Sequence, residues 1–426
     1  MTTIIDTKRD NKKGLEKEHS NKAALFTLFL IVFLDMVGVG IIIPILPSIF
    51  YGNAFFPLTL SENARNILLG FLIAAYPIAQ FFSAPVLGRL SDKYGRKKIL
   101  IISLIGTFFS YILFALGIVF SNIYLLFLSR VLDGITGGNI SVATSAISDL
   151  SDKKTKMKNF GLIGMAVGLG FILGPFIGGK LTDQNLVSWF NLSTPFWFAA
   201  CLVVLNIIFV IVFLRETIKQ KVDKKISMSD GINNIKNAFA IKELRLLFLI
   251  IFLANFGWAF FTQFFQVYLY HRFDYSPSQI GSLFAYVGLW IAITQGFLIR
   301  VISSRFSSES ILRISLILTP IILSIITLQN NPNSFYIFLP LMAVFFGLVH
   351  PSFSVILSDS ADDQSQGEIM GMRQSLLSLS QALPPLLAGA ALSLGESTPL
   401  ILASITIAVS WIIFLFYKNN GTVHSL

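Results

Sequence analysis

Long apolar segments recur along the whole chain, and they restrict its fold more than any other feature. An α-helix rises 1.5 Å per residue, so about twenty apolar residues cross the ~30 Å hydrocarbon core of a bilayer. The chain is 54% hydrophobic and 13% charged, whereas a soluble domain carries about 25% charged residues. We therefore expect an all-α polytopic membrane protein. The twelve predicted spans are 24–50, 63–87, 99–120, 122–149, 160–180, 193–214, 244–270, 277–299, 309–329, 334–358, 368–392 and 398–417.

Lysine and arginine residues predict the orientation of these spans. Of the 32 Lys and Arg residues, 27 fall in the tails and in the loops on one side, and only Arg65, Lys180 and Arg272 fall on the other. Basic loops remain in the cytoplasm, so both termini are predicted to be cytoplasmic. Residues 1–23 lack the apolar region and cleavage site of a signal peptide and, like 418–426, are expected to be a cytoplasmic tail. The net charge of +10 marks one membrane face and does not indicate a nucleic-acid partner.

The longest and most basic loop, from Arg215 to Arg245, divides the spans into two groups of six. We expect an N-terminal half at 24–215, a linker at 216–243 and a C-terminal half at 244–417. Within the linker, apolar residues on one face of Ser229 to Phe239 predict a surface helix.

An internal repeat supports this division. A shift of 210 residues aligns the halves without a gap over more than forty residues. The alternative is chance matching of residues that are common in membranes, but two copies of a six-helix unit are typical of secondary transporters. The shift places Ser148 and Asp149 on Ser358 and Asp359, Gly137 on Gly347, Gly161 on Gly371, Pro175 on Pro385, and Gly179 on Gly389.

A charged turn joins the second and third spans. Gly88 and Gly95 permit close backbone approach or unusual dihedral angles, Asp92 stands where we expect a helix to end, and Arg96 begins the next segment. An ordinary cytoplasmic loop would need the basic residues but not the glycines and Asp92. The pattern resembles the loop motif between helices 2 and 3 of the major facilitator superfamily of secondary transporters. This resemblance implies a loop that controls conformational switching.

The fourth span contains Arg130 and Asp133. An ionisable residue inside a span costs about 2.5–3.5 kcal/mol on insertion scales, so it needs a partner or an aqueous cavity. The two side chains can share a helix face at i, i+3. The pair could simply lock helix packing, or Asp133 could gain and lose a proton. The segment resembles a fourth-span motif of the same superfamily that is associated with proton transfer, with Asp133 replacing the usual polar residue.

The first span contains Asp35, close to the middle of the predicted membrane segment. No basic residue in that span can neutralise it. Asp35 is therefore a second candidate proton carrier. The alternative is a packing residue held by hydrogen bonds.

The fifth span is rich in glycine. Glycines at short spacing let helices approach closely, and proline can bend a membrane helix. Generic tight packing is one explanation. The pattern also resembles an antiporter motif found in exporters and typically missing from sugar symporters of the same fold, and the resemblance favours export over uptake. The motif residues are Gly170, Gly174, Pro175, Gly178 and Gly179.

Other polar and aromatic residues within the spans are candidates for a substrate cavity. A site for an amphipathic molecule needs a few polar groups among apolar walls, although each residue alone is more often a packing residue. Arg373 and Gln381 are further polar groups within the spans. The candidates are Tyr76, Gln80, Asn139, Asn255, Trp258, Gln263, Gln266, Trp290, Gln295, His350 and Gln374.

The full pattern identifies the chain as similar to the tetracycline-efflux-like branch of drug:proton antiporters, above all over residues 24–215. The resemblance implies a twelve-helix fold, a central cavity and proton-driven efflux of a small molecule by a monomer in the cytoplasmic membrane. Tetracycline exporters carry an acidic residue in span 3, where this chain has Ser110, and a histidine in span 8, near Trp290 here. We therefore expect a substrate other than tetracycline.

Two alternatives remain at this point. A permease for a siderophore or metabolite, including an importer, would share the fold. A membrane enzyme or receptor would need a nucleophile, a metal cluster or an appended domain. The single cysteine, Cys201, lies in a span, and the four histidines are far apart, so neither a thiolate metal site nor a disulfide framework is expected. No cofactor is expected.

Overall fold

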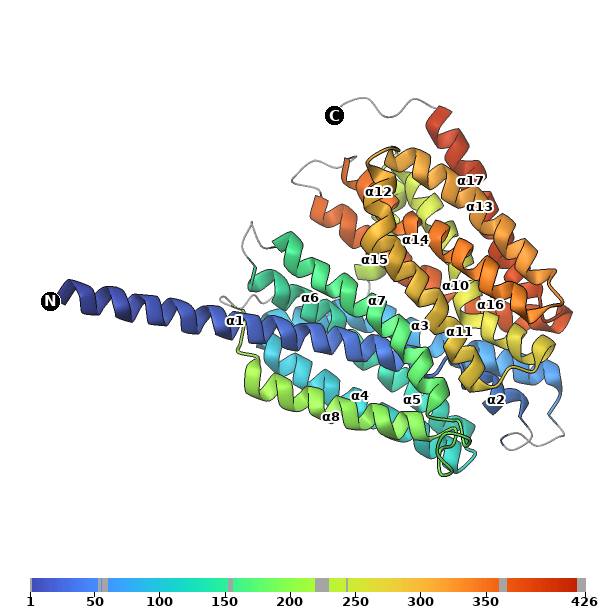
Figure 1. Ribbon diagram of the computed structural model, residues 1–426, viewed down its shortest axis with the longest axis horizontal. Coiled ribbons are helices and arrows are strands. Elements are labelled where there is room, and N and C mark those ends of the chain that lie inside the picture. The colour runs from blue at the N-terminus through green and yellow to red at the C-terminus, as the bar shows by residue number, and fades with distance from the viewer. Residues whose placement is uncertain are drawn as a thin grey trace.

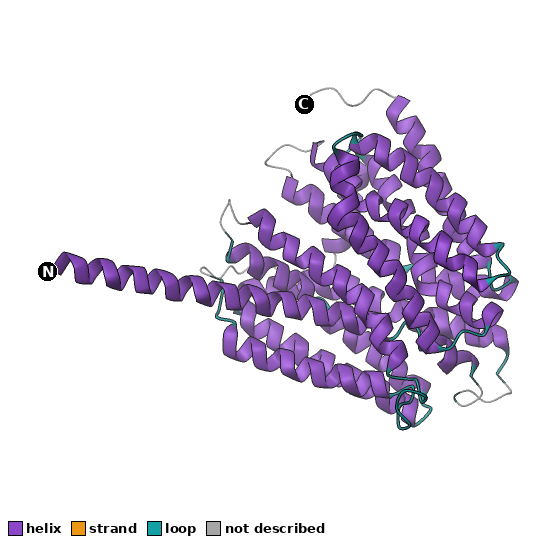
Figure 2. Cartoon of the chain, in the orientation of Figure 1, coloured by secondary structure: helices purple, strands orange, loops and turns teal. Residues whose placement is uncertain are grey.

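All regular elements in the described part of the chain are helices, and this part contains no strand (Figure 2). Eleven helices are long and apolar enough to cross a membrane. The all-α prediction is therefore confirmed. The structure is a computed structural model that describes residues 2–52, 55, 60–151, 156–218, 230–242, 244–359 and 366–419.

The predicted span at 122–149 is the exception, because it forms two shorter helices. These are α5 (Ile123–Thr136) and α6 (Asn139–Asp149), which meet at Gly137 and Gly138. A Cβ atom at Gly138 would lie 2.8 Å from Cα of Ala84 in the neighbouring helix. The glycines thus let the interrupted span pack closely against the second span.

The N-terminal half contains the helices before the linker. They are α1 (Thr2–Ile41), α2 (Leu46–Tyr51), α3 (Glu62–Tyr94), α4 (Arg96–Val119), α5, α6, α7 (Lys156–Lys180) and α8 (Thr194–Phe213).

The C-terminal half contains α10 (Arg245–Phe273), α11 (Pro277–Ile293), α12 (Ile299–Ser303), α13 (Ser308–Thr327), α14 (Phe335–Asp359), α15 (Gln366–Ala382), α16 (Pro384–Ala391) and α17 (Thr398–Asn419). A π-helical turn at Thr294–Leu298 joins α11 to α12.

The two halves lie closest at one end of the molecule, around α2, α11 and α16 (Figure 1). Two glycine contacts related by the sequence repeat hold them there. Gly389 on α16 packs against Gly70 on α3, and Gly179 on α7 packs against Pro277 at the start of α11. Because Gly179 and Gly389 correspond under the shift of 210, the closed end has the pseudo-symmetry that the repeat predicted.

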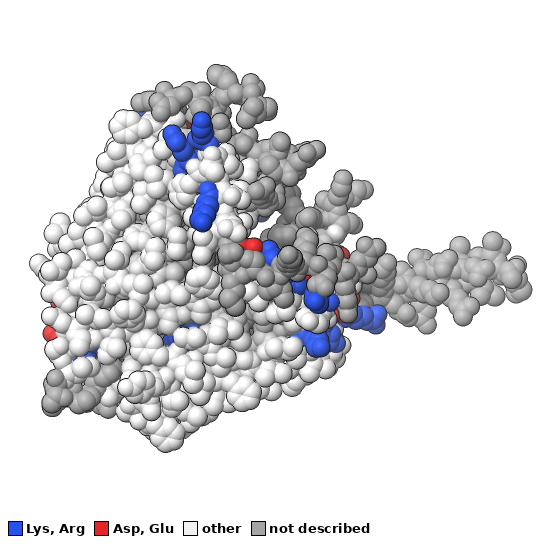
Figure 3. All heavy atoms as spheres, turned by 180° about the vertical axis from the view of Figure 1, so that it is seen from behind, with Lys and Arg blue, Asp and Glu red and all other residues white. Residues whose placement is uncertain are grey.

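The opposite ends of the halves diverge (Figure 1). Gly161, Gly164 and Gly168 on α7, and Gly371 on α15, have nothing within 4 Å of the position that a Cβ atom would occupy. On the face shown in Figure 3, Lys and Arg side chains gather toward this end, from which α1 projects, and most of the remaining surface is uncharged. The open end is therefore the basic end.

One predicted helix boundary is wrong. Helix α3 continues to Tyr94, beyond Asp92, because the reversal needs only Gly95, whose φ of 107° is outside the range of most L-residues. Helix α1 begins at Thr2, and the candidate membrane span that includes it begins at Lys22, close to the predicted residue 24.

A helix, α9 (Asp230–Ala240), is present at the position predicted for the surface helix. Its buried residues are Gly231 and Ala238, whereas the apolar Ile232 and Phe239 are exposed. Small residues face inward because α9 packs against helices of both halves, α3 and α15.

Candidate functional site

Arg130 and Asp133 form a buried ion pair on α5. Arg130 Nη2 lies 2.8 Å from Asp133 Oδ2, and their side chains are 4% and 5% exposed. Ser110 on α4 donates a hydrogen bond of 3.2 Å to the other carboxylate oxygen. The guanidinium also lies over the rings of Tyr76 and Phe114, 5.7 Å and 5.2 Å from their centroids. The predicted pair is therefore present, and its charge is compensated within the N-terminal half.

Asp35 on α1 has no such compensation. It is 7% exposed, and its Oδ2 atom has no hydrogen-bond partner in the described part of the chain. Its electrostatic neighbours are Asp133 and Asn139, so the structure brings both predicted carboxylates together. Asn139, at the start of α6, is fully buried, and both of its amide atoms are unpartnered among the described residues. Arg130 thus pairs with Asp133, and no cation among the described residues acts on Asp35.

The interruption of the fourth span lies beside this group. Gln80 on α3 donates a 2.8 Å hydrogen bond to the carbonyl oxygen of Gly137, which the break between α5 and α6 releases from helical bonding. It also donates to the hydroxyl of Tyr76 over 3.0 Å. Ser83 Oγ donates to the carbonyl oxygen of Gly134 over 2.9 Å. Tyr76 and Gln80 were predicted to line a cavity, and in this structure they support the backbone next to the carboxylates.

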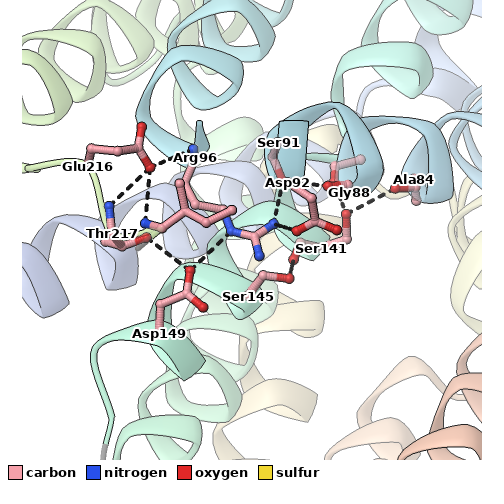
Figure 4. A network of polar contacts seen from close by, with 12 residues as sticks. Ala84, Gly88, Ser91, Asp92, Arg96, Ser141, Ser145, Asp149, Glu216 and Thr217 are labelled. Carbon is pink, nitrogen blue, oxygen red and sulfur yellow. Dashed lines mark hydrogen bonds and ion pairs between the residues drawn. The ribbon is translucent and has the colours of Figure 1, made fainter. Parts of the chain in front are cut away.

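The charged turn forms a second polar group at the open end (Figure 4). Arg96 Nη1 lies 2.6 Å from Asp92 Oδ1, and Arg96 Nε lies 3.2 Å from Asp149 Oδ2 at the end of α6. Glu216 accepts a 2.8 Å hydrogen bond from the backbone N–H of Arg96, the first residue of α4. A Cβ atom at Gly95 would clash with the Glu216 carboxylate. The turn thus ties the second, third and fourth spans to the start of the linker.

Gly88, the other glycine of the turn, has a smaller structural role. Its carbonyl oxygen accepts a 2.6 Å hydrogen bond from Ser91, and a Cβ atom there would lie 3.7 Å from Ser141 Oγ, an ordinary contact. The predicted close approach at Gly88 is therefore mild, and the strict requirement for glycine is at Gly95.

Sequence reasoning missed Ser110, Asp149 and Glu216 as members of these polar groups. The internal repeat could have indicated Asp149, because it aligns this residue with Asp359. No sequence pattern indicated Glu216, because it lies 120 residues from its partner Arg96 in a loop of mixed charge. Ser110 was noted only as the place of a missing acid.

The glycine motif of α7 divides between two neighbours. Gly170, Gly174 and Gly178 face α1, where a Cβ atom at Gly174 would lie 2.6 Å from the carbonyl oxygen of Val37. Gly179 faces α11 of the other half, and Pro175 contacts both neighbours, with its ring against Gly40 on α1 and its carbonyl oxygen against Gly281 on α11. The motif therefore joins the helix that carries Asp35 to the closed end of the molecule.

The C-terminal half holds an aromatic pair beside two basic residues. Trp258 on α10 stacks on Phe346 on α14, with centroids 3.7 Å apart and planes inclined by 7°. Phe346 meets His350 edge-on at 5.8 Å. Arg373 on α15 lies in the electrostatic neighbourhood of His350. Three helices thus contribute to one cluster of side chains.

The remaining candidates take different roles. Asn255 donates to the carbonyl oxygen of Ile251 over 2.7 Å. Gln266 donates to the carbonyl oxygen of Gln263, and Gln263 donates to that of Gln381, across the α10–α15 contact. These three amides therefore bond to backbone in this structure. Trp290 is partly buried, whereas Gln295 and Gln374 are exposed.

Comparison with known proteins agrees with this architecture. The model of the family "Major Facilitator Superfamily" matches residues 28–248 and again 247–425. The class H tetracycline resistance protein of Pasteurella multocida is 31% identical over 378 residues, covering 86% of this chain and 88% of the relative. Multidrug resistance protein 1 of Bacillus subtilis (strain 168) is 29% identical, covering 95% and 98%. Among solved structures, a D-xylose-proton symporter shares the fold, with a TM-score of 0.73 and 14% identity, covering 92% of this chain and 96% of the symporter.

Proposed function

The chain belongs to the Major Facilitator Superfamily, and from this membership we propose that it is a proton-coupled antiporter that exports a small amphipathic organic compound. The family and the fold are those of transporters and not of enzymes. Two of its relatives are named for resistance to tetracycline and to multiple drugs, which favours export of a small organic molecule. We place the protein in the cytoplasmic membrane as a monomer with both termini in the cytoplasm.

The observation that carries the proposal is the uncompensated carboxylate of Asp35. It is buried, it lies beside the Arg130–Asp133 pair, and Oδ2 has no hydrogen-bond partner in the described part of the chain. A carboxylate in this position can be neutral when protonated or can release its proton when water or substrate reaches it. It also lies on α1, which packs along the glycine motif of α7. Proton binding and the contact between the halves are therefore linked through two neighbouring helices.

Alternating access supplies the transport step. The halves meet at one end and diverge at the basic end, so with the basic loops in the cytoplasm the protein is open to the cytoplasm. Substrate enters there, and rocking of the halves closes this end and opens the other. The charged turn at Arg96 holds the spans of the N-terminal half at the end that must close.

Transport in vesicles of known orientation tests the proposal. Compounds are first selected by a growth-inhibition and metabolite-export screen that compares cells with and without the protein. In inside-out vesicles with an acidic lumen, a selected compound should accumulate and the lumen should become more alkaline. The Asp35→Asn variant should not couple these two events. Accumulation in right-side-out vesicles instead would overturn export and favour a permease that imports a siderophore or metabolite.

A further inference from the structure

We propose that Arg373 and His350 form an anion site beside the aromatic pair of Trp258 and Phe346, and that the exported compound carries a negatively charged group next to an aromatic ring. The proposal rests on the proposed transport function and adds the chemical class of the substrate. It concerns the C-terminal half, whereas the carboxylates assigned to proton coupling lie in the N-terminal half.

Arg373 is the first observation. It lies on α15, inside the apolar span Ile369–Leu394. In the described part of the chain it forms no hydrogen bond or ion pair, and its Nε atom is enclosed without a partner. An arginine within a span is costly unless it has a partner or reaches water, so an unpaired one indicates a functional site. Arg130 also has a buried Nε atom without a partner among the described residues, but its Nη2 atom forms an ion pair with Asp133.

Arg373 also differs from the other arginines near the basic end of this half. Arg300, Arg305 and Arg313 are exposed, as expected for residues that interact with headgroups and water. Arg373 is partly buried. Simple snorkelling to the membrane surface therefore does not explain its position.

The described residues near Arg373 are an imidazole and aromatic rings. His350 on α14 lies in its electrostatic neighbourhood. No carboxylate acts on Arg373 from the described residues. Phe346 lies one turn before His350 and carries the stacked ring of Trp258 from α10. The described residues thus supply the positive charge of Arg373, hydrogen-bond donors and a flat aromatic surface, but no carboxylate.

The chemistry of these groups defines the ligand. A guanidinium presents a planar fork of donors that fits the paired oxygens of a carboxylate, sulfonate or phosphate. An aromatic ring attached to that group can pack against Trp258 and Phe346. A cationic compound would meet Arg373 at close range without a countercharge, and would be disfavoured. The site therefore selects anionic aromatic compounds.

Three dansyl compounds that share one fluorophore test the site. Dansylglycine is an anion, dansylglycinamide is neutral and dansylcadaverine is a cation. Their binding to the purified full-length protein is followed by dansyl emission and by energy transfer from tryptophan. Dansylglycine should bind at least about tenfold more tightly than the other two, as expected from one charge-assisted hydrogen bond.

Substitutions test whether Arg373 causes this preference. Arg373→Met should remove the preference for dansylglycine, and Arg373→Lys should retain part of it because the positive charge remains. The matched control is Arg305→Met, which removes an exposed arginine of the same half and should leave all three affinities unchanged. Size-exclusion profiles confirm that each variant is folded.

The outcomes separate this proposal from the proposed function. Failure of dansylglycine to bind, equal binding of the three compounds, or a preference that survives Arg373→Met would each overturn the anion site, even if the vesicle assay shows export. Conversely, an anion preference that depends on Arg373 would support the site even if no proton-coupled export of any compound is found. In that case only the proposed antiport function would be wrong.

Discussion

At the scale of single residues, the two carboxylates of the N-terminal half differ in their partners. Asp133 is bound by Arg130 at 2.8 Å and by Ser110 at 3.2 Å, whereas Asp35 has no cation among the described residues. Asp133 therefore has a cation as a direct partner, and Asp35 does not. Because of this difference, Asp35 is the first candidate for the group that binds the proton, and Asp133 is the second.

We expect Asp35→Asn to abolish the proton release that substrate induces in detergent, and Asp133→Asn to reduce it. An amide at Asp35 removes the group without a counter-ion, whereas removing Asp133 leaves Arg130 buried and unpaired. A pH dye in weak buffer measures the release. Downhill exchange of substrate should survive in Asp35→Asn, which serves as the control for folding. Unchanged proton release from this variant would leave Asp133 as the remaining candidate.

The charged turn gives a second prediction at this scale. Asp92→Asn should reduce transport at least about tenfold while insertion is unchanged, because a neutral amide cannot maintain the 2.6 Å ion pair with Arg96. Lys97→Ala should have a smaller effect, since Lys97 donates only an exposed hydrogen bond, to the carbonyl oxygen of Ile211. Transport rates in vesicles, normalised to the amount of inserted protein, measure both. A wild-type rate in Asp92→Asn would exclude a switching role for this carboxylate.

At the scale of elements, helix α7 has two parts. Its second part packs tightly on α1 and α11, while Gly161, Gly164 and Gly168 in its first part face open space. Glycine is therefore required for packing in one part of the helix in this conformation, and in the other part it is not.

Valine substitutions can separate these two parts. Gly179→Val should lower the stability of the purified protein by about 1–3 kcal/mol, because the new side chain would overlap the backbone of Pro277. Gly164→Val should leave the stability of this conformation nearly unchanged. Thermal unfolding in detergent compares the two variants. Equal destabilisation would show that the first part of α7 is also closely packed in solution.

At the scale of the whole molecule, the halves are in contact at one end and separated at the other. Gly70 meets Gly389 at the closed end, and Tyr51 Oη donates a 2.6 Å hydrogen bond to Asn66 Oδ1 nearby. At the open end, α9 links the halves, because Asp230 pairs with Arg89 on α3 and Asn234 donates a 3.2 Å hydrogen bond to Ser375 on α15. Closing that end requires α9 to shift.

Cysteine labelling tests this arrangement. In a Cys201→Ser background, Gly371→Cys at the open end should react rapidly with a polar maleimide, whereas Asn66→Cys, where the native residue is 4% exposed, should react slowly. A transported substrate or a pH gradient should lower the first rate and raise the second, because the two ends open alternately. Labelling rates by mass spectrometry measure the change. Rates that rise or fall together would contradict alternating access.

The sequence alone determined the helical class, the order of the spans and the repeat, because hydropathy and spacing are local properties of the chain. It also indicated Asp35, Arg130 and Asp133, since an ionisable residue is conspicuous in any apolar span. Only the tertiary structure brought Asp35 beside Asp133 and placed the Glu216 carboxylate against Gly95. It also left Arg373 on α15 without a partner among the described residues. Those features depend on contacts between helices that are far apart in the chain, and no local pattern encodes which side chains a packed bundle brings within hydrogen-bond distance.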